Sequence, residues 1–279
     1  MAQGSVNKTI PIALTVLRTE QIGPSMHRVV LGGDNFETYW ARHQALPGYT
    51  DTYVKLVFWP DGFRAPRDVD LSDPPGGVRP VLRTYTIRAV DPQAREVVID
   101  FVTHGDEGVA GPWAVNVQPG EWIHVRGPNG GYAPDPAADH HLFVGDEAAL
   151  PAISASIEAM PAGATATAFV EVDGPADEVR LDTRADVTVH WLHRGGAARG
   201  STTLLDDAVR SWNWPAGRVQ AFVHGESALL KSVRPYVLTD RGVDRRDVSV
   251  SAYWRRGETE EGFRVWKSQQ VEAVMRPTR

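Results

Sequence analysis

Residues 142–160 read LFVGDEAALPAISASIEAM, and this stretch decides the fold of the second half of the chain. A short apolar run at 142–144 leads through Gly145-Asp146-Glu147 into a helical pattern that continues to residue 160. A buried strand followed by a helix is the repeating unit of a parallel α/β sheet. Further apolar runs follow at 165–172, 187–192, 219–223 and 248–253. Helical patterns come after the runs at 187–192 and 219–223. The sequence therefore predicts an α/β domain with a parallel sheet.

The first half of the chain has a different pattern, in which short runs alternate apolar and polar residues between Gly, Pro and Asp turns. Six such runs are candidate strands, at 10–17, 27–31, 52–58, 82–89, 96–102 and 121–126. Because no strong helical pattern separates them, they favour a closed six-stranded antiparallel β-barrel. The segment PDPAAD at 134–139 is the expected linker. We predict a barrel domain at 1–137 and an α/β domain at 138–279.

The composition of the chain limits the chemistry that it supports. There is no cysteine among the 279 residues, which excludes disulfides, cysteine-bound zinc, iron–sulfur clusters and a thiolate nucleophile. The nine histidines show no metal-site spacing, and no GxSxG nucleophile motif occurs. The net charge of −6 argues against nucleic-acid binding. No export signal and no apolar run of about 20 residues appears, so we expect a cytoplasmic protein without membrane insertion.

Polar residues gather where the predicted parallel strands end. Gly145-Asp146-Glu147, Glu171-Val172-Asp173 and His224-Gly225-Glu226 each end a buried strand. Ligands of open α/β sheets bind beyond these carboxyl ends, and helix N-terminal amides there suit phosphate groups. The glycine fingerprint GxGxxG is missing, so the spacing alone gives only a weak indication of dinucleotide binding.

Two segments of the predicted barrel have residues suited to a flat, phosphorylated ligand. In Arg83-Thr84-Tyr85-Thr86, strand alternation places Arg83 and Tyr85 on one face, where they can pair with a phosphate and pack on a planar ring. The glycine-rich turn at 108–114 can bring backbone amides to a pyrophosphate. Each segment also has an ordinary structural explanation, a surface Arg stacked on Tyr and a turn before a short helix. The first segment taken alone favours that explanation.

The motifs of the chain occur in a characteristic order. They are RTYT at 83–86, DFVTHG at 100–105, a glycine-rich turn ending in WA, QPGEWIHVRGPNGG at 118–131, VGDEAALPAI at 144–153, WLHRGG at 191–196, HGE at 224–226 and YWRRG at 253–257. This order resembles the siderophore-interacting protein family, whose members are flavin-containing ferric-siderophore reductases of the ferredoxin-reductase-like superfamily. The resemblance covers residues 10–265. It implies an FAD-binding barrel followed by an NAD(P)H-binding α/β domain.

The resemblance also implies which residues hold the cofactors. The flavin ring and its phosphates would contact Arg83, Thr84, Tyr85 and Thr86. Phe101, Val102 and His104 would line the path toward the adenine of FAD. The backbone of Val109, Ala110 and Gly111 would contact the FAD pyrophosphate. The nicotinamide side would be formed by Gly145, Asp146, Glu147, Pro151, Gly225 and Glu226. Arg194 would meet a ribose phosphate and so favour NADPH over NADH.

Three positions depart from the pattern of the family. Gly111 and Pro112 stand where a hydroxyl residue and an Arg are common, and Ala148 stands where Thr is common. These changes remove hydrogen-bond donors near the expected pyrophosphate and flavin, where backbone contacts can still be made.

The resemblance further implies a ferric siderophore as substrate, met by the basic residues Lys55, Arg255 and Arg256. Electrons would pass from NADH or NADPH through FAD to Fe(III), with a ferredoxin as another candidate donor, and Fe(II) would leave. Because the flavin does the chemistry, we assign no catalytic side chain and no resident metal ion. The alternatives are a general NAD(P)H:flavin or quinone-type reductase on the same fold and a non-catalytic siderophore- or flavin-binding protein.

Overall fold

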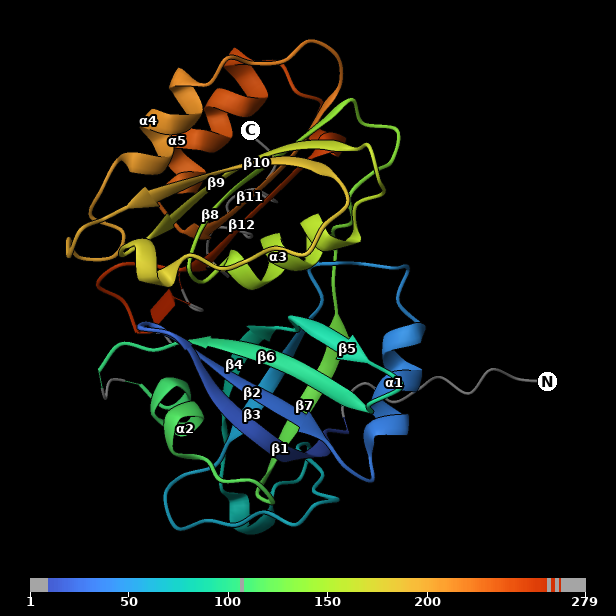
Figure 1. Cartoon of the computed structure of the whole chain (residues 1–279). Helices are drawn as coiled ribbons and strands as arrows, with labels where there is room; N and C mark the ends of the chain where they lie inside the picture. The colour runs from blue at the N-terminus through green and yellow to red at the C-terminus, as the bar shows by residue number, and fades with distance from the viewer. Residues whose placement is uncertain (1–9, 106–107, 260–261, 264–265, 267–279) are drawn as a thin grey trace, which may run out of the picture. The chain divides into compact units, whose positions relative to one another are not determined.

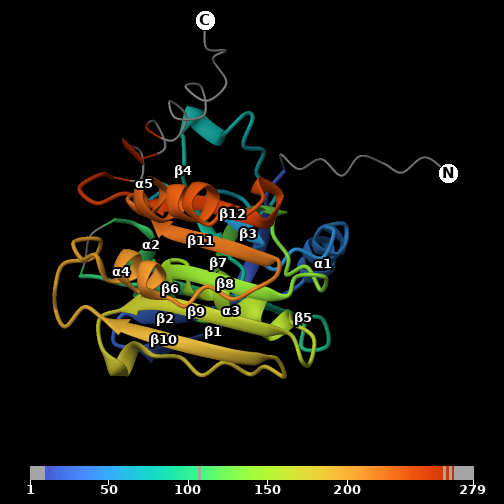
Figure 2. The ribbon, with the colours of Figure 1, turned by 90° about the horizontal axis from the view of Figure 1, so that it is seen from above.

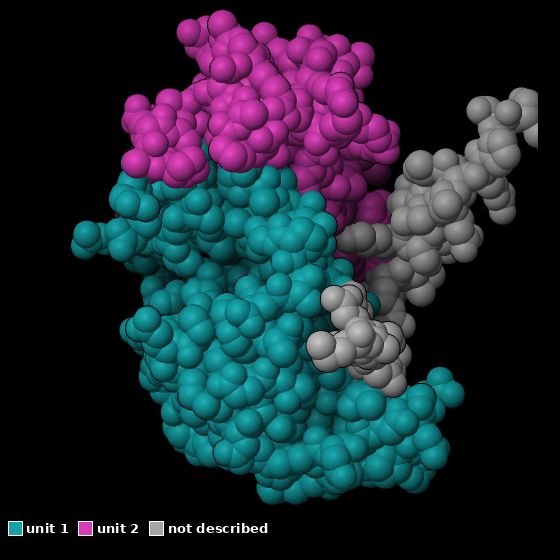
Figure 3. Space-filling view, turned by 90° about the vertical axis from the view of Figure 1, so that its right-hand side faces the viewer, with its two compact units in different colours: residues 1–134, 151–160, 176–184 teal, residues 135–150, 161–175, 185–279 magenta. Residues whose placement is uncertain are grey.

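The computed structural model describes residues 10–105, 108–259, 262–263 and 266. The chain forms two compact units (Figure 3). The first contains Met1–Pro134, Pro151–Met160 and Ala176–Arg184, and the second contains Asp135–Leu150, Pro161–Pro175 and Ala185–Arg279. Among the described residues, no helix is both long enough and apolar enough to cross a membrane.

The first unit contains an antiparallel sheet of seven strands in the order β4-β3-β7-β1-β2-β6-β5 (Figure 1). The strands are β1 (Ile12–Gly23), β2 (Met26–Gly32), β3 (Tyr53–Phe58), β4 (Val81–Thr86), β5 (Ala89–Asp91), β6 (Glu96–Val102) and β7 (Trp122–Asn129). Their inward-facing residues form one hydrophobic core, which includes Leu14, Leu31, Leu56 and Ile99. Removing this apolar surface from water is the main force that holds the sheet together.

The two edges of this sheet meet around residues 87 and 88. The amide of Ile87 donates to the carbonyl of Thr52, next to β3, at 2.7 Å, and the amide of Arg88 donates to the carbonyl of Val98 on β6 at 2.8 Å. The sheet therefore closes into the predicted barrel. It has one strand more than the six predicted, because the run 82–89 divides into β4 and the short strand β5 where the chain changes its hydrogen-bond partner.

The helices of the first unit are packed into the barrel core or attached to the barrel by polar contacts. They are α1 (Phe36–Gln44), α2 (Ala110–Asn116) and most of α3 (Leu150–Ala159), with short helical turns η1 (Pro75–Gly77) and η2 (Pro175–Asp177). Arg88 donates to both carboxylate oxygens of Glu158 on α3, at 2.7 and 2.6 Å. Asp177 accepts hydrogen bonds from the backbone amide and the hydroxyl of Ser25, at 3.1 and 2.6 Å. These contacts explain why residues 151–160 and 176–184 belong with the barrel.

The second unit contains a parallel sheet of five strands in the order β10-β9-β8-β11-β12 (Figure 2). The strands are β8 (His140–Asp146), β9 (Thr165–Val172), β10 (Asp186–His193), β11 (Val219–Glu226) and β12 (Val248–Trp254). All neighbouring strands in this sheet run parallel, which confirms the predicted α/β fold.

Helices α4 and α5 lie together on one face of this parallel sheet (Figures 1 and 2). The helical segments are α4 (Leu204–Ser211), α5 (Leu229–Pro235), η3 (Tyr236–Asp240) and η4 (Arg245–Asp247). Leu205, Val209 and Val233 of the helices share one hydrophobic core with Val144 and Val223 of the sheet. Because the strands are parallel, all of their carboxyl ends lie at one edge, where an α/β sheet binds its ligands.

Candidate functional site

Arg83 and Tyr85 of β4 share one face of the strand. Each lies opposite a core residue of β3, Leu56 and Val54 respectively. Both side chains are half-buried, and the ring of Tyr85 packs against the buried ring of Phe101 on β6 with the centroids 4.4 Å apart. A half-buried aromatic ring near a guanidinium group suits a planar ligand that carries phosphate groups.

The other barrel residues predicted to contact the flavin differ in exposure. Thr84 and His104 are exposed, and Val102 is half-buried. Thr86 is buried at the end of β4, where it pairs with Tyr53. The side chains of Thr84, His104 and Val102 are therefore accessible to a ligand, whereas little of the Thr86 side chain is accessible.

Gly108 and Val109, both exposed, lead into α2. Ala110 and Gly111 form the first turn of α2, and the side chain of the N-cap residue Val109 makes no capping hydrogen bond. Gly108 has a φ of +78°, and an added Cβ there would meet nothing within 4 Å. First-turn amides lack partners within their own helix, and an open backbone lets a phosphate approach them. Together with Arg83 and Tyr85, this turn suits an FAD molecule.

Lys55 of β3 is exposed and belongs to a polar row across three neighbouring strands. It lies directly opposite Thr84 of β4 on one side and Arg126 of β7 on the other. Within the part of the chain that the structure describes, neither Lys55 nor Arg126 forms an ion pair. Like charges that face each other across a sheet are destabilising, so an anion bound over this row would relieve their repulsion. The sequence analysis identified Lys55 and missed Arg126, because a single sequence does not give the strand register.

In the second unit, the carboxylate of Asp146 at the end of β8 joins the ends of three strands. Its Oδ2 accepts hydrogen bonds from Trp254 Nε1 at 2.7 Å and from the amide of Glu226 at 2.9 Å. Its Oδ1 accepts one from the amide of Ala148 at 3.0 Å. Burial raises the pKa of Asp146 to about 6, against the lowering effect of the hydrogen bond from Trp254. Asp146 is therefore a fixed part of the strand-end edge.

Gly225 and Glu226 belong to the same edge, at the end of β11. Gly225 has a φ of +137°, and an added Cβ would lie 2.8 Å from Asp146 Oδ2. Glu226 is buried and accepts hydrogen bonds from the Ser227 hydroxyl and from the amide of Arg256, each at 3.0 Å. The predicted nicotinamide-side residues of this unit therefore gather at one edge, namely Gly145, Asp146, Glu147, Gly225 and Glu226.

The remaining predicted residues lie in different settings. Arg255 follows β12, lies 3.7 Å from Glu258, and places its guanidinium 5.1 Å from the ring centroid of Trp266. Arg256 is exposed, and its backbone amide is held by Glu226. Pro151 is buried in the first turn of α3, which groups with the first unit. Of the two arginines, Arg256 therefore has the more accessible charge.

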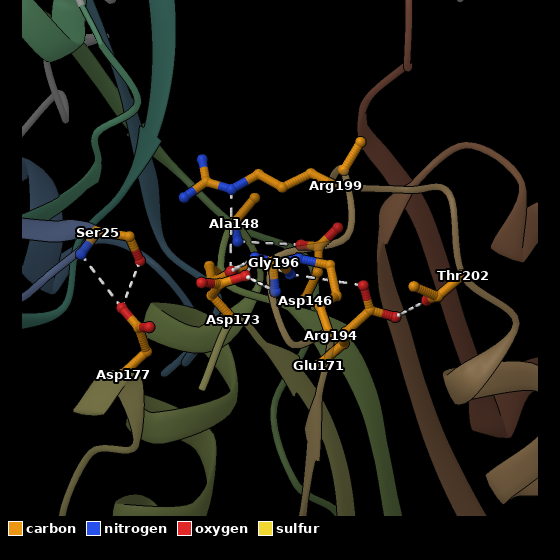
Figure 4. Close-up of polar contacts among 12 residues, drawn as sticks. Ser25, Asp146, Ala148, Glu171, Asp173, Asp177, Arg194, Gly196, Arg199 and Thr202 are labelled. Carbon is orange, nitrogen blue, oxygen red and sulfur yellow. Dashed lines mark hydrogen bonds and ion pairs between the residues drawn. The ribbon is translucent and has the colours of Figure 1, made fainter. Parts of the chain in front are cut away.

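Arg194, just after β10, lies at the centre of a buried ion-pair network (Figure 4). Its side chain is 2% exposed and donates to both carboxylate oxygens of Glu147, one of them at 3.0 Å. The same guanidinium lies 3.5 Å from Glu171 and 3.7 Å from Asp173. Carboxylates already balance the charge of Arg194, which does not fit its predicted contact with a ribose phosphate. The sequence analysis placed Glu171 and Asp173 at a strand end but assigned them no role.

Two family models match the chain and divide it between them. Residues 15–132 match the siderophore-interacting FAD-binding domain, and residues 138–257 match the siderophore-interacting protein model. The chain belongs to the siderophore-interacting protein family. The family predicted from the order of the motifs is thereby confirmed.

Relatives of known sequence match the chain over most of its length. It is 47% identical to an uncharacterized protein of Mycobacterium tuberculosis, over 94% of this chain and 96% of the relative. It is 29% identical to the ferric vibriobactin reductase ViuB of Vibrio cholerae, over 92% and 94% respectively. It is 30% identical to the NADPH-dependent ferric-chelate reductase of Escherichia coli, over 86% and 91%. Matches of this extent include both units of the chain.

Solved structures agree with the predicted fold. A siderophore utilization protein from T. fusca aligns with a TM-score of 0.74 at 39% identity, over 89% of this chain and 94% of that one. A ferredoxin-NADP+ reductase from Plasmodium falciparum aligns with a TM-score of 0.60 at 10% identity, over 87% and 96%. The second likeness concerns the fold alone, and it confirms the ferredoxin-reductase-like architecture.

Proposed function

We propose that this chain is an FAD-dependent ferric-siderophore reductase that takes electrons from NAD(P)H. The observation that carries the proposal is the match of residues 15–132 to a siderophore-interacting FAD-binding domain, on a barrel whose Arg83, Tyr85 and 108–111 turn suit a flavin. The names of the Vibrio cholerae and Escherichia coli relatives support ferric chelates as the electron acceptors. In this proposal residues 1–137 bind FAD and residues 138–279 bind the nucleotide.

The chain contributes binding and positioning to this reaction. FAD, when bound, accepts a hydride from a nicotinamide and releases electrons one at a time to iron. Tyr85 would pack on the flavin ring, Arg83 would pair with a phosphate, and the backbone of Val109, Ala110 and Gly111 would hold the pyrophosphate. No side chain is assigned as an acid, a base or a nucleophile, because the bound flavin would carry out the hydride and electron transfers.

The strand-end edge of the second unit would hold the nucleotide. The hydrogen bonds of Asp146 keep the ends of β8, β11 and β12 in a fixed relation, and the missing side chain of Gly225 lets this carboxylate pack directly against β11. A preorganised edge of this kind saves the entropy that ordering it during binding would cost. Pro151 is proposed as a further nucleotide contact from the resemblance of its motif.

Basic side chains would attract the ferric siderophore. The exposed Lys55 and the half-buried Arg126 form a cationic pair on the barrel, and Arg255 and Arg256 follow the last strand of the α/β domain. Many ferric siderophore complexes are anionic, and exposed cations raise the local concentration of such ligands. The chain as a whole is acidic, with a net charge of −6, so the attraction comes from these local groups.

An absorbance spectrum followed by anaerobic reduction tests the proposal. We expect the purified chain to show flavin bands with FAD, to lose them on mixing with NADH or NADPH, and to release Fe(II) to a chelator when a ferric siderophore is added. If the nucleotide bleaches the flavin bands but the chain reduces free flavin or quinones faster than ferric siderophores, the chain would be a general reductase. A chain that binds FAD and is not bleached would be a binding protein.

Two further expectations from the sequence have tests of their own. A reduced ferredoxin added in place of the nucleotide tests whether it also donates electrons. A cytoplasmic location is part of the proposal, and cell fractionation with an antibody against the chain tests it.

A further inference from the structure

The strand-end edge of the second unit carries more carboxylates than guanidinium groups. Glu171 and Asp173 lie beside Arg194 (Figure 4). Glu147 pairs with Arg194, and Nε of Arg199 lies 3.9 Å from Glu147. We infer that this arrangement makes the chain select NADH over NADPH as its electron donor. The inference rests on the proposed function and names the nucleotide that the α/β domain takes.

The sheet order places the adenine ribose of a dinucleotide near these carboxylates. The chain builds outward from β8 through β9 to β10 and then returns to β11 on the other side of β8, so the direction reverses between β8 and β11. Dinucleotides bind across such a reversal, beyond the carboxyl ends of the strands. In these folds an Asp or Glu on the adenine side accepts a hydrogen bond from the 2′-hydroxyl of NAD, and an Arg accommodates the 2′-phosphate of NADP. Here β9 ends in Glu171-Val172 and is followed by Asp173.

Arg194 is not available to a 2′-phosphate in this arrangement. Its side chain is 2% exposed, and those of its partners Glu147 and Glu171 are 3% and 6% exposed. Moving the guanidinium to a phosphate would leave buried carboxylates without a compensating charge, which is strongly unfavourable. Arg199 has a more exposed side chain, at 23%, but it also lies beside Glu147. Arg194 and Arg199 are therefore already paired with carboxylates.

The charge that remains at this edge disfavours a second phosphate. The three carboxylates outnumber the two guanidinium groups by one before any nucleotide binds. A 2′-phosphate would add a charge of about −1.5 to −2. A 2′-hydroxyl adds no charge and can donate a hydrogen bond, which carboxylates accept.

Asp173 is the accessible acceptor of this group and therefore the specificity-determining residue. Its side chain is 48% exposed, in contrast to those of Glu147 and Glu171. Oδ1 of Asp173 accepts a hydrogen bond from the amide of Gly196 at 3.1 Å. Within the described residues Oδ2 has no recorded partner, which leaves it able to accept from a ribose hydroxyl.

Direct binding separates the two nucleotides without any turnover. The probes are 5′-AMP and adenosine 2′,5′-bisphosphate, the adenosine halves of NADH and NADPH, titrated by calorimetry into the FAD-loaded full-length chain. We expect 5′-AMP to bind about tenfold more tightly or better, and this ratio to shrink as salt is raised, because the discrimination is electrostatic. Equal or tighter binding of the bisphosphate would overturn the inference.

A charge-neutral variant tests the assigned residue. Asp173→Asn should lower the preference for NADH, measured as the ratio of anaerobic flavin-reduction rates with NADH and NADPH, by about fivefold. Asp186→Asn is the matched control, because it removes the same charge at the opposite end of β10, where Asp186 is exposed. An unchanged ratio in Asp173→Asn, or an equal change in both variants, would overturn the role of Asp173.

The failure of this inference can be told apart from the failure of the proposed function. Faster flavin reduction by NADPH than by NADH overturns the inference and leaves the reductase proposal standing. If neither nucleotide reduces the flavin, the proposed electron donor is wrong, and the adenosine titration still measures the discrimination. Siderophore reduction is not read in any of these measurements.

Discussion

Trp254, the last residue of β12, donates its indole N–H to Oδ2 of Asp146 at the end of β8, at 2.7 Å. Strand β11 lies between these two strands, and the amide of Glu226 at its end donates to the same oxygen. One carboxylate thus joins three strand ends at the edge where an α/β sheet binds its ligand. The geometry of this edge is held by hydrogen bonds to one buried carboxylate.

The titration of Asp146 should be visible in the pH dependence of stability. Burial raises its pKa to about 6 in the folded chain from an ordinary 3.8, so the folded chain holds this proton more tightly than the unfolded chain does. Its stabilising contribution is complete below about pH 4 and is lost as the pH rises through about 6. The free energy of unfolding of the wild type should fall over that interval by about 3 kcal/mol relative to Asp146→Asn, which does not titrate.

Urea unfolding of both proteins at several pH values, followed by circular dichroism, measures this difference. The variant is expected to be less stable at low pH. The NH2 group of its Asn side chain would face the backbone N–H of Ala148, which donates a hydrogen bond to the Asp146 carboxylate in the wild type. Its profile should then approach that of the wild type as the pH rises. Parallel profiles of the two proteins would show that Asp146 keeps its ordinary pKa.

Gly225 should not tolerate even the smallest side chain. A Cβ there would lie 2.8 Å from Asp146 Oδ2, and the φ of +137° is strained for any other residue. We expect Gly225→Ala to lower the free energy of unfolding by about 2–4 kcal/mol, because overpacking and backbone strain add. Gly174→Ala in the same unit is the control, since an added Cβ meets nothing within 4 Å there. Equal unfolding temperatures for the two variants would contradict the close packing of Gly225 on Asp146.

The fold was predictable because it follows from local patterns. Alternation and turn residues predict most of the barrel strands, and apolar runs followed by helical patterns predict the parallel sheet. The division of the run 82–89 into β4 and β5 was not predictable, because it depends on Arg88 finding Val98 as a partner on a distant strand.

The site was harder to predict for the same reason. Arg194 has the sequence position of a phosphate ligand, yet Glu147 and Glu171, which are distant in sequence, neutralise it. Arg126 lies opposite Lys55 only because of the register between β3 and β7. A single sequence gives the chemistry of each residue and the direction of its strand, but it does not give the partner across the sheet.

Arg83 should contribute to FAD binding through charge. A guanidinium that pairs with a phosphate makes charge-assisted hydrogen bonds worth about 1.5–3 kcal/mol, so Arg83→Ala should raise the dissociation constant of FAD by roughly tenfold to a hundredfold. Arg79→Ala is the matched control, because Arg79 is an exposed arginine in the loop before β4. Both constants can be measured by quenching of flavin fluorescence on titration of the apoprotein. Equal FAD affinity in the two variants would remove Arg83 from the cofactor site.

Lys55 and Arg126 should act as a pair on anionic ferric siderophores. Removing either charge by Lys55→Ala or Arg126→Ala should raise KM for an anionic complex by about fivefold, with little change in kcat and in KM for a neutral complex. The effect should weaken with added salt, because salt screens the attraction between charges. Neither variant should lower the unfolding temperature, because Lys55 and Arg126 lie directly opposite each other and repel. Lys231→Ala, at an exposed lysine of α5, is the control and should leave KM unchanged. Equal losses for anionic and neutral complexes would show that the pair acts through structure, since a charge effect must depend on the charge of the substrate.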